Sequence, residues 1–516
     1  MWIANADRCR EIDKRAREEF GVTTEELMER AGSAVFEAAQ DLMPAGGRIA
    51  VVCGKGNNGG DGFVVARLAF EAGYGVDCLV AAAEDTLSPD AKRRLEEARA
   101  AGVVPVFCDG EKWAKKLECL ACKNVIVDAL LGTGAKGLVE GAIRDAVRAI
   151  NRSGVPVVSV DLPSGVSCDT GEELGDSVWA VRTVTFGLPK PFLFQGTGLE
   201  HAGHWTVADI GFPRELLEEP TDRKLVDADW VGCMLPERTR ACHKGDNGTV
   251  LIVAGSRRYL GAAALAARGA LRAGAGLVMV ASVPSVCELV AAQVPETIHL
   301  PLPEIDGVIS PEAADAVLEA ARTADAAVFG PGLTSSEAAR EFLSLVWPQW
   351  HRPCCIDADA LNAVAHGVRL PDAECVLTPH PGEMGRLMRC SSAEIQADRF
   401  GVANKAAQAF GKSVLLKGAF SIVASEGEPT LINGTGNPGM AAGGMGDVLS
   451  GIVGTLLAQS LPPYYAAACG AFWHGLAGDR CAHRIGSIGF TASEVANALP
   501  GARATIVEEC DQKQSC

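Results

Sequence analysis

Residues 437–451 read NPGMAAGGMGDVLSG. Three glycines, Gly443, Gly444 and Gly446, come directly before Asp447, and an apolar run typical of a helix follows it. Glycines let successive backbone N–H groups turn toward one point, and a helix N-terminus adds its dipole, so the stretch predicts an anion-binding hole. Asp447 would lie beside this hole, where a hydroxyl group attacking a phosphoryl group needs a base. The alternative is a glycine-rich turn in which Asp447 only caps a helix.

Length and charge restrict the kind of protein. A chain of 516 residues is too long for one ordinary domain. Its formal charge of −17 disfavours nucleic acid and anionic membranes as partners and is compatible with a homo-oligomer. The apolar stretch 262–283 is interrupted by Arg268 and Arg272, and the N-terminus has no apolar signal core. We therefore expect a cytoplasmic protein without a membrane span.

The N-terminal half begins with a nucleotide-binding pattern. A strand over residues 49–53 runs into GKGNNGGDG, residues 54–62, and a helix is expected from Phe63 to about Glu71. This is GxGxxG between a strand and a helix, the context of the dinucleotide fingerprint, and Asp77 falls near the position of the ribose-binding acid.

Strands and helices then alternate as in a doubly wound parallel sheet, whose ligand crevice lies beyond the carboxyl ends of the strands. A second GxGxxG loop, GTGAKG, occupies residues 132–137, and the strand 156–160 ends in DLPSG, residues 161–165. All three special loops are expected at that one edge. Two glycine loops facing one crevice suit a ligand with more than one phosphate.

Polar residues at the strand ends are candidates for chemistry. Asn58, Asp128 and Ser164 are oxygen donors that suit a monovalent or divalent cation, although turn caps would use the same residues. Asp161 follows an apolar strand and precedes a Leu-Pro pair, so it is a candidate acid/base. A turn-capping role for Asp161 remains the alternative.

The periodic strands stop after Gly211, and an acidic segment bracketed by Pro213 and Pro220 follows. We expect domains over residues 1–218 and 229–505, a linker over 219–228 and a flexible tail over 506–516. The second domain repeats the strand–helix alternation and again places motifs after strands. A second crevice, containing the opening stretch, follows from this pattern.

Seven motifs together resemble one known family over nearly the whole chain. They are NNGGDG (57–62), DLPSG (161–165), HKG (243–245), GPG (330–332), DADALN (357–362), TPHPGE (378–383) and GGMGDVLSG (443–451). Their order is similar to that of the bifunctional NAD(P)H-hydrate repair enzymes. The resemblance implies an N-terminal NAD(P)H-hydrate epimerase with a Rossmann-like doubly wound sheet. It also implies a C-terminal ADP-dependent NAD(P)H-hydrate dehydratase, a ribokinase-like α/β sandwich.

The resemblance also implies roles in the N-terminal half. Asp161 would contact the nicotinamide hydrate as acid/base, and potassium would bind to Asn58, Asp128 and Ser164. The hydrated dinucleotide, NADHX or NADPHX, would be held by two loops, composed of Asn57, Asn58, Gly59, Gly60 and Asp61, and of Gly132, Thr133, Gly134, Ala135, Lys136, Gly137 and Leu138.

In the C-terminal half, the resemblance implies that Gly332, His380 and Asp447 face the S hydrate. ADP, accompanied by Mg²⁺, would be held by Lys417, Gly418, Ala419, Phe420, Ser421 and Gly446, with Gly443 and Gly444 completing the anion hole. One departure is Thr334, where the family pattern leads us to expect glycine. It puts the local shape of that loop in doubt.

The chemistry of such a site can be argued independently. Hydroxide is a poor leaving group, and phosphorylation of the hydrate's hydroxyl makes it a good one, so a kinase-like site can drive a dehydration. The alternatives are a ribokinase-type small-molecule kinase fused to a dinucleotide-binding domain, and an N-terminal half that only senses dinucleotides. A stable phosphorylated product would indicate the kinase, and epimerisation by residues 1–220 would exclude the sensor.

Overall fold

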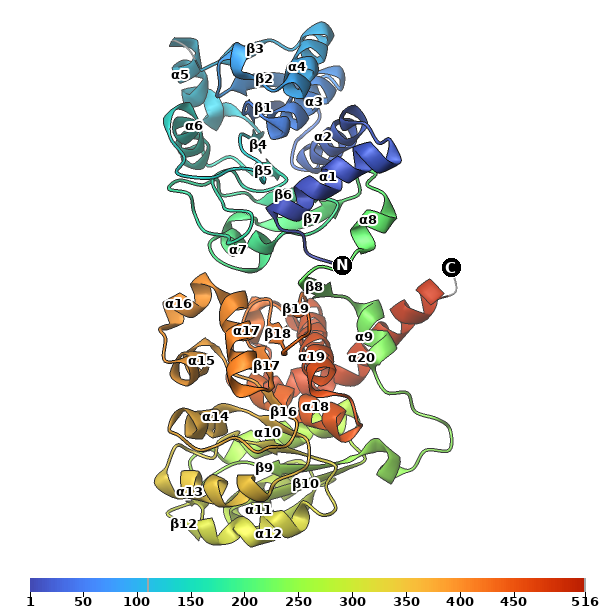
Figure 1. The fold of residues 1–516 in the computed structure, drawn as a ribbon, viewed down its shortest axis with the longest axis vertical. Helices are drawn as coiled ribbons and strands as arrows, with labels where there is room; N and C mark the ends of the chain where they lie inside the picture. Colours follow the sequence, from blue (N-terminus) through green and yellow to red (C-terminus); the bar gives the residue numbers. More distant parts are fainter. Residues whose placement is uncertain (109–110, 515–516) are drawn as a thin grey trace. The chain divides into compact units, whose positions relative to one another are not determined.

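The computed structural model describes residues 1–108 and 111–514 and divides into two compact units, Met1–Thr221 and Asp222–Cys516 (Figure 1). Each unit contains a mixed α/β fold around a largely parallel sheet. The expectation of two α/β domains is thereby confirmed. Among the described residues no helix is long and apolar enough to cross a membrane.

The first unit is a seven-stranded parallel sheet with the order β3-β2-β1-β4-β5-β6-β7. Its strands are β1 (Arg48–Cys53), β2 (Gly75–Val80), β3 (Pro105–Phe107), β4 (Val125–Ala129), β5 (Val157–Val160), β6 (Arg182–Phe186) and β7 (His204–Ala208). The chain moves outward from β1 to β3 and returns to pair β4 with β1, so the strand order reverses between β1 and β4. A ligand crevice is expected at such a point.

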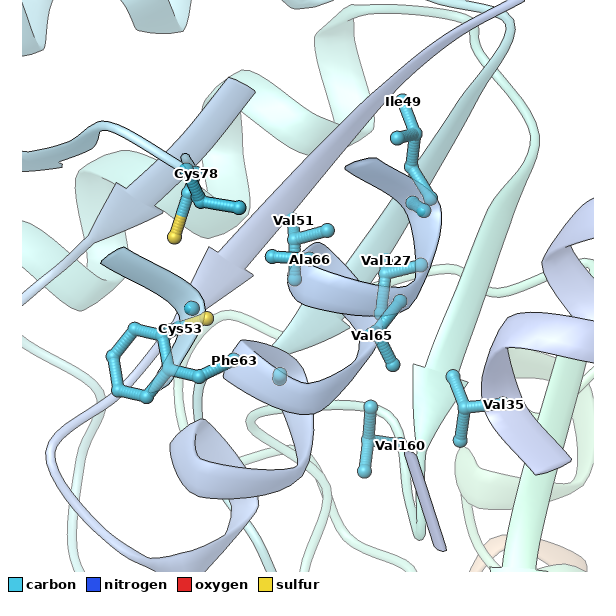
Figure 2. Close-up of a cluster of buried hydrophobic side chains, with 14 of the residues drawn as sticks. Val35, Ile49, Val51, Cys53, Phe63, Val65, Ala66, Cys78, Val127 and Val160 are labelled. Atoms are coloured by element: carbon cyan, nitrogen blue, oxygen red, sulfur yellow. The ribbon is translucent and has the colours of Figure 1, made fainter. Parts of the chain in front are cut away.

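Helices cover both faces of this sheet, as the doubly wound pattern predicts. They are α1 (Ala6–Phe20), α2 (Thr24–Gln40), α3 (Asn57–Glu71), α4 (Pro89–Ala101), α5 (Glu111–Glu118), α6 (Gly141–Arg152), α7 (Gly198–His201) and α8 (Arg214–Glu218). Side chains alternate along β1, so Val51 packs with Phe63 and Val65 of α3 on one face, whereas Val52 packs with Val147 of α6 on the other. Figure 2 shows the first of these two cores.

The start of α3 differs from the expected position. The helix begins at Asn57 rather than Phe63, so the predicted binding loop is the first turns of a helix. Gly59 permits this close start, since a Cβ built there would lie 2.0 Å from the carbonyl oxygen of Gly54. Strands β6 and β7 were not expected from the sequence.

The second unit has a ten-stranded sheet with the order β11-β10-β9-β14-β15-β16-β17-β18-β19-β8, and a separate hairpin of β12 and β13. The strands are β8 (Arg223–Val226), β9 (Thr249–Val253), β10 (Leu277–Ser282), β11 (Ile298–Pro301), β12 (Glu304–Ile305), β13 (Val308–Ile309), β14 (Ala326–Phe329), β15 (Cys354–Ile356), β16 (Cys375–Leu377), β17 (Ser413–Leu416), β18 (Ile422–Ala424) and β19 (Thr430–Asn433). Strands β18 and β19 pair in antiparallel fashion.

The helices of this unit lie on both sides of the sheet. They are α9 (Ala228–Met234), α10 (Leu260–Ala273), α11 (Pro284–Gln293), α12 (Ala314–Ala320), α13 (Glu337–Val346), α14 (Ala358–Ala365), α15 (Pro381–Met388), α16 (Ser392–Ala397), α17 (Arg399–Phe410), α18 (Met445–Ala458), α19 (Pro463–Ile485) and α20 (Ala492–Gln514). Helix α10 packs against α11 and α18 and lies against β9 and β10, which Figure 1 labels beside it.

Two segments that were expected to be irregular contain regular structure. The expected linker, residues 219–228, includes β8, which pairs in parallel with β19 and so belongs to the second sheet. Residues 506–514 of the expected flexible tail continue α20, and Ile506 is fully buried. Residues 515 and 516 of that tail lie outside the described residues.

Candidate active sites

A cavity of about 690 Å³ opens at the carboxyl ends of β1, β4 and β5. Asn57, Asn58 and Asp61 line it from the start of α3, residues 132–136 line it from the loop after β4, and Asp161 lines it from the end of β5. The structure therefore brings the three predicted motifs together. Of the other predicted binding residues, Gly59, Gly60, Gly137 and Leu138 do not line the cavity, and Leu138 is 72% exposed.

A buried cluster of oxygen atoms lies next to this cavity, which Asn58 and Leu131 line and Asp128, Ser159 and Ser164 do not. The Ser164 hydroxyl donates to Asp128 Oδ1 at 2.5 Å, and the Ser159 hydroxyl and the Ser164 N–H donate to Asp128 Oδ2 at 2.9 and 2.8 Å. Asn58 Nδ2 donates to the Leu131 carbonyl oxygen at 2.9 Å. Burial raises the pKa of Asp128, although these hydrogen bonds oppose the shift. Asn58 and Ser164 both form hydrogen bonds with the backbone of Leu131, and Ser164 also donates to Asp128, so the three predicted cation ligands lie next to one another.

Asp161 has an unusual backbone conformation, and its side chain is held by Lys190, a residue that was not predicted from the sequence. The backbone φ of Asp161 is +66°, a strained region for a residue with a side chain. Asp161 Oδ1 accepts hydrogen bonds from Lys190 Nζ at 2.6 Å, from Thr185 Oγ1 at 2.9 Å and from the Phe186 N–H at 3.2 Å. Among the described residues, none donates a hydrogen bond to Oδ2. One carboxylate oxygen is therefore fixed while the other is available to a molecule in the cavity.

Lys190 is fully enclosed by protein and makes its other hydrogen bonds to Thr185 Oγ1 and the Phe186 carbonyl, at 2.8 and 2.9 Å. Burial alone would lower the pKa of Lys190, but the charge and hydrogen bond of Asp161, together with the effects of Cys9 and Cys168, outweigh burial and raise the pKa. Lys190 thus remains a cation that stabilises the Asp161 carboxylate. A lysine between Pro189 and Pro191 is the only signal of this role in the sequence.

The suggested ribose-binding role of Asp77 is wrong. Asp77 is the third residue of β2, toward the end of the strand opposite the crevice, and it does not line the cavity. It forms ion pairs with Lys116 and Lys123. The fingerprint predicts how many residues separate the glycine loop from the acid, but it does not predict where along β2 the acid lies.

In the second unit, the opening stretch forms the N-terminus of α18. Gly444 is the N-cap with φ +87°, and a Cβ there would lie 2.5 Å from Leu265 Cδ1, so glycine is required on both counts. Gly446 and Asp447 occupy the first turn of the helix. The expected glycine-rich helix start is therefore present, with its backbone N–H groups at the positive end of the helix dipole.

A charged network surrounds this helix start. Lys417 Nζ donates to Asp357 Oδ1 at 2.7 Å, and the Ser450 hydroxyl donates to Asp357 Oδ2 at 2.6 Å. A Cβ at Gly446 would lie 3.3 Å from Lys417 Nζ, so the ammonium group lies beside the helix start. Burial and repulsion from Asp357 raise the pKa of Asp447 to about 7, against the opposing effect of Lys417. The sequence motif DADALN contains Asp357, but no role for Asp357 was predicted from it.

His380 is the N-cap of α15. Its Nδ1 accepts hydrogen bonds from the N–H groups of Gly382 and Glu383, so the ring proton of the neutral form is on Nε2. Burial, followed by the charge of Lys417, lowers the pKa of His380, which favours that neutral form. Lys417 Nζ also lies 3.9 Å from Glu383 Oε2, which joins the His380 turn to the same site.

Gly332 and Thr334 shape the loop after β14. Gly332 has φ +67° and lies against Tyr259 and Ala262. Thr334 has φ +71°, a left-handed conformation that favours glycine. This conformation accounts for the glycine that the family pattern has at the position of Thr334. Its N–H donates to Asp359 Oδ2 at 2.8 Å, so the loop keeps a hydrogen bond that fixes its shape.

The turn between β17 and β18, residues 418–421, is held from beneath by Arg399 of α17. The guanidinium donates to the carbonyl oxygens of Ala419 and Phe420, and Arg399 is 2% exposed. Burial lowers the pKa of Arg399 to about 10. Its two backbone contacts make it a support for the turn that the sequence did not reveal.

The resemblance implies that this turn holds ADP. We therefore expect Arg399→Lys to weaken nucleotide binding by about tenfold, because lysine lacks the planar fork that reaches two carbonyl groups. The KM for ADP should rise while the KM for the hydrate stays unchanged, as measured by steady-state kinetics. Arg389→Lys, at the C-cap of α15, is the matched control. An unchanged KM for ADP in Arg399→Lys would contradict the supporting role.

Comparison with known proteins gives matches in both units. The family described as YjeF-related protein N-terminus matches residues 24–192, and the family described as NAD(P)H-hydrate dehydratase matches residues 250–501. The bifunctional NAD(P)H-hydrate repair enzyme of Moorella thermoacetica is 39% identical over 99% of this chain and 98% of its own. The corresponding Escherichia coli enzyme is 37% identical over 97% and 93%.

A solved structure supports the fold of the second unit. A ribokinase-like superfamily protein from Enterococcus faecalis is 24% identical, covers 56% of this chain and 98% of its own, and has a TM-score of 0.50. At this identity the likeness concerns the fold alone, which is the expected ribokinase-like α/β fold.

Proposed function

Because the chain belongs to the family of bifunctional NAD(P)H-hydrate repair enzymes, we propose that it repairs hydrated NADH and NADPH. The first unit interconverts the R and S hydrates, and the second dehydrates the S hydrate with ADP as phosphoryl donor. The observation that carries this proposal is the helix start at Gly444–Asp447, with Lys417 beside it and a carboxyl group whose pKa is raised to about 7.

In the first unit, the start of α3 and the loop after β4 bind the dinucleotide through backbone N–H groups and small side chains. Asp161 acts as acid/base through its free oxygen, and Lys190 keeps the other oxygen in place. Asn58, Asp128 and Ser164 fit potassium because every donor is an oxygen and Asp128 supplies a negative charge. The bound cation would order the three strand ends that form the cavity.

In the second unit, Asp447 accepts the proton of the hydrate's hydroxyl group, whose oxygen attacks the β-phosphorus of ADP. AMP leaves, and the N–H groups at the start of α18 and Lys417 stabilise the transferring phosphoryl group. The C–O bond to phosphate then breaks, the neighbouring ring carbon loses a proton to the departing phosphate, and the ring double bond is restored. His380 and Gly332 line the hydrate side of the site. The carboxylates of Asp357 and Glu383, which lie beside Lys417, would hold the Mg²⁺ that accompanies the donor, and the ion would neutralise phosphate charge.

A cytoplasmic location agrees with the proposal, because the structure describes free cysteines in both units, as in a reducing compartment. The second candidate function is that of a ribokinase-type kinase, favoured only by the fold of the second unit. The two functions differ in the fate of the phosphoryl group, which either leaves as phosphate or stays on the product.

The proposal is tested with the purified full chain, S hydrate, ADP and Mg²⁺. We expect NAD(P)H absorbance to return and one phosphate and one AMP to form for each hydrate consumed. A phosphorylated product that accumulates would support the kinase instead. No reaction with either ADP or ATP would refute both.

A further inference from the structure

The cavity of the first unit contains an acid that the assignments above do not use. Asp13, on α1, lines the cavity together with Asp61 and Asp161. Helix α1 is fixed over the loop after β6 by a hydrogen bond from the Ala4 N–H to the Pro189 carbonyl oxygen at 3.0 Å. Ile12 packs with Leu188 in a buried cluster. The neighbouring Asp13 is therefore held at the wall of the cavity by the same loop that carries Lys190.

Asp13 has no structural partner in the described part of the chain. Its carboxyl group takes part in no hydrogen bond or ion pair there, in contrast to Asp161, whose Oδ1 has three donors. A carboxyl group that is fixed by its helix but unpaired, and that faces a cavity, is free to exchange a proton with a ligand.

The charges around Asp13 separate it chemically from Asp161. Asp13 is an exposed residue at the cavity wall. Partial loss of water around its carboxyl group and then the charge of Asp161 raise its pKa to about 6, while Lys190 and Arg17 oppose the shift. Asp61, from α3, is also pushed toward the neutral form, mainly by burial. Asp161 is the carboxylate that has a buried lysine as counter-ion. Two carboxyl groups at one cavity, one paired with a lysine and one unpaired, can act as a donor and an acceptor of protons.

We propose that Asp13 is the second acid/base group of the epimerase, acting as the partner of Asp161. This inference rests on the proposed function. The hydrate carries its hydroxyl on the ring carbon next to the nitrogen. One carboxyl group donates a proton to this hydroxyl, the C–O bond breaks, and the nitrogen lone pair forms a C=N bond as water leaves. A water then adds to the opposite face, the C=N pair returns to nitrogen, and the other carboxylate takes the released proton.

This step conserves atoms and electrons. One water leaves and one water adds at the same carbon, no oxidant is needed, and the proton gained by one carboxyl group equals the proton lost by the other. A proton transfer through solvent returns the pair to its starting state. Two groups are required because departure and addition occur on opposite faces of the ring.

The test uses Asp13→Asn in the full chain. Interconversion of purified R and S hydrates is followed by chromatography without ADP, so that the second unit is inactive. We expect the rate to fall about 100-fold or more, which is the usual contribution of a general acid–base group. Dehydration of the S hydrate with ADP should stay unchanged. Asp7→Asn on the same helix is the control, since Asp7 is largely exposed and, in the part of the chain that the structure describes, pairs with Arg10 alone.

Two further readouts separate catalysis from structure. The wild-type rate should fall as pH rises through about 6, because the proton of Asp13 is lost, and this limb should disappear in Asp13→Asn. In H₂¹⁸O, epimerised hydrate should carry ¹⁸O above the level of an enzyme-free blank. Near-normal epimerisation by Asp13→Asn, or retention of ¹⁶O, would overturn the inference. A wild-type chain that does not epimerise would refute the proposed function itself.

Discussion

Asp447→Asn should lower the rate of S-hydrate dehydration by about 1000-fold or more, because the amide cannot accept the proton of the attacking hydroxyl. Epimerisation should be unaffected, since Asp447 belongs to the second unit. In the wild type, kcat/KM should rise with pH through about 7, as the carboxyl group, whose pKa is raised by burial and by Asp357, becomes ionised. Steady-state assays from pH 5 to pH 9 check both points.

The same substitution should stabilise the fold at high pH. A raised pKa in the folded state means that the folded chain binds the proton more tightly, so stability falls as pH rises from about 4 to about 7. Asp447→Asn removes this penalty, and we expect it to gain on the order of 2 kcal/mol at pH 8 and almost nothing at pH 4. Thermal unfolding at the two pH values measures the difference. An active variant, or one destabilised at pH 8, would exclude the assigned role.

Asp161→Asn should slow conversion of the R hydrate about 1000-fold while leaving dehydration of supplied S hydrate intact. The reason is that Asp161 faces the cavity with a carboxyl group that is ion-paired to the buried Lys190. The substitution also leaves Lys190 without its counter-charge. We expect a loss of about 3 kcal/mol in the unfolding free energy, the usual cost of breaking a buried pair.

A double variant separates these two effects. Asp161→Asn combined with Lys190→Met removes both charges and should restore most of the stability, but it should not restore epimerisation. Chemical unfolding and chromatography of the two hydrates give the two readouts. Recovery of epimerisation in the double variant would mean that Asp161 matters only as the partner of Lys190.

Local sequence signals are sufficient to predict where some helices begin and end. Helix α4 begins and ends at local signals, because Ser88 caps it, Pro89 occupies its first turn and Gly102 ends it in the left-handed conformation. Gly444 likewise forms the predicted helix start. In contrast, α3 begins at Asn57, although asparagine and glycine are poor helix formers, because packing against the end of β1 overrides propensity.

The missed residues depend on contacts that no local pattern encodes. Lys190 meets Asp161 only when β5 and β6 are paired, and Asp13 reaches the cavity only when α1 packs on the loop after β6. Strand β8 is completed by β19, roughly two hundred positions later. The predicted ribose-binding role of Asp77 was wrong for the opposite reason. Asp77 has the expected spacing along the chain, but it does not lie at the crevice.

The central claim is that one chain converts R hydrate to NAD(P)H through two separate sites. The most direct measurement is NADH absorbance during incubation of the full chain with purified R hydrate, ADP and Mg²⁺. The account predicts complete return of NADH, with S hydrate accumulating instead when Asp447→Asn is used. Failure of the wild type to consume R hydrate faster than an enzyme-free blank, or formation of a stable phosphorylated hydrate, would contradict it.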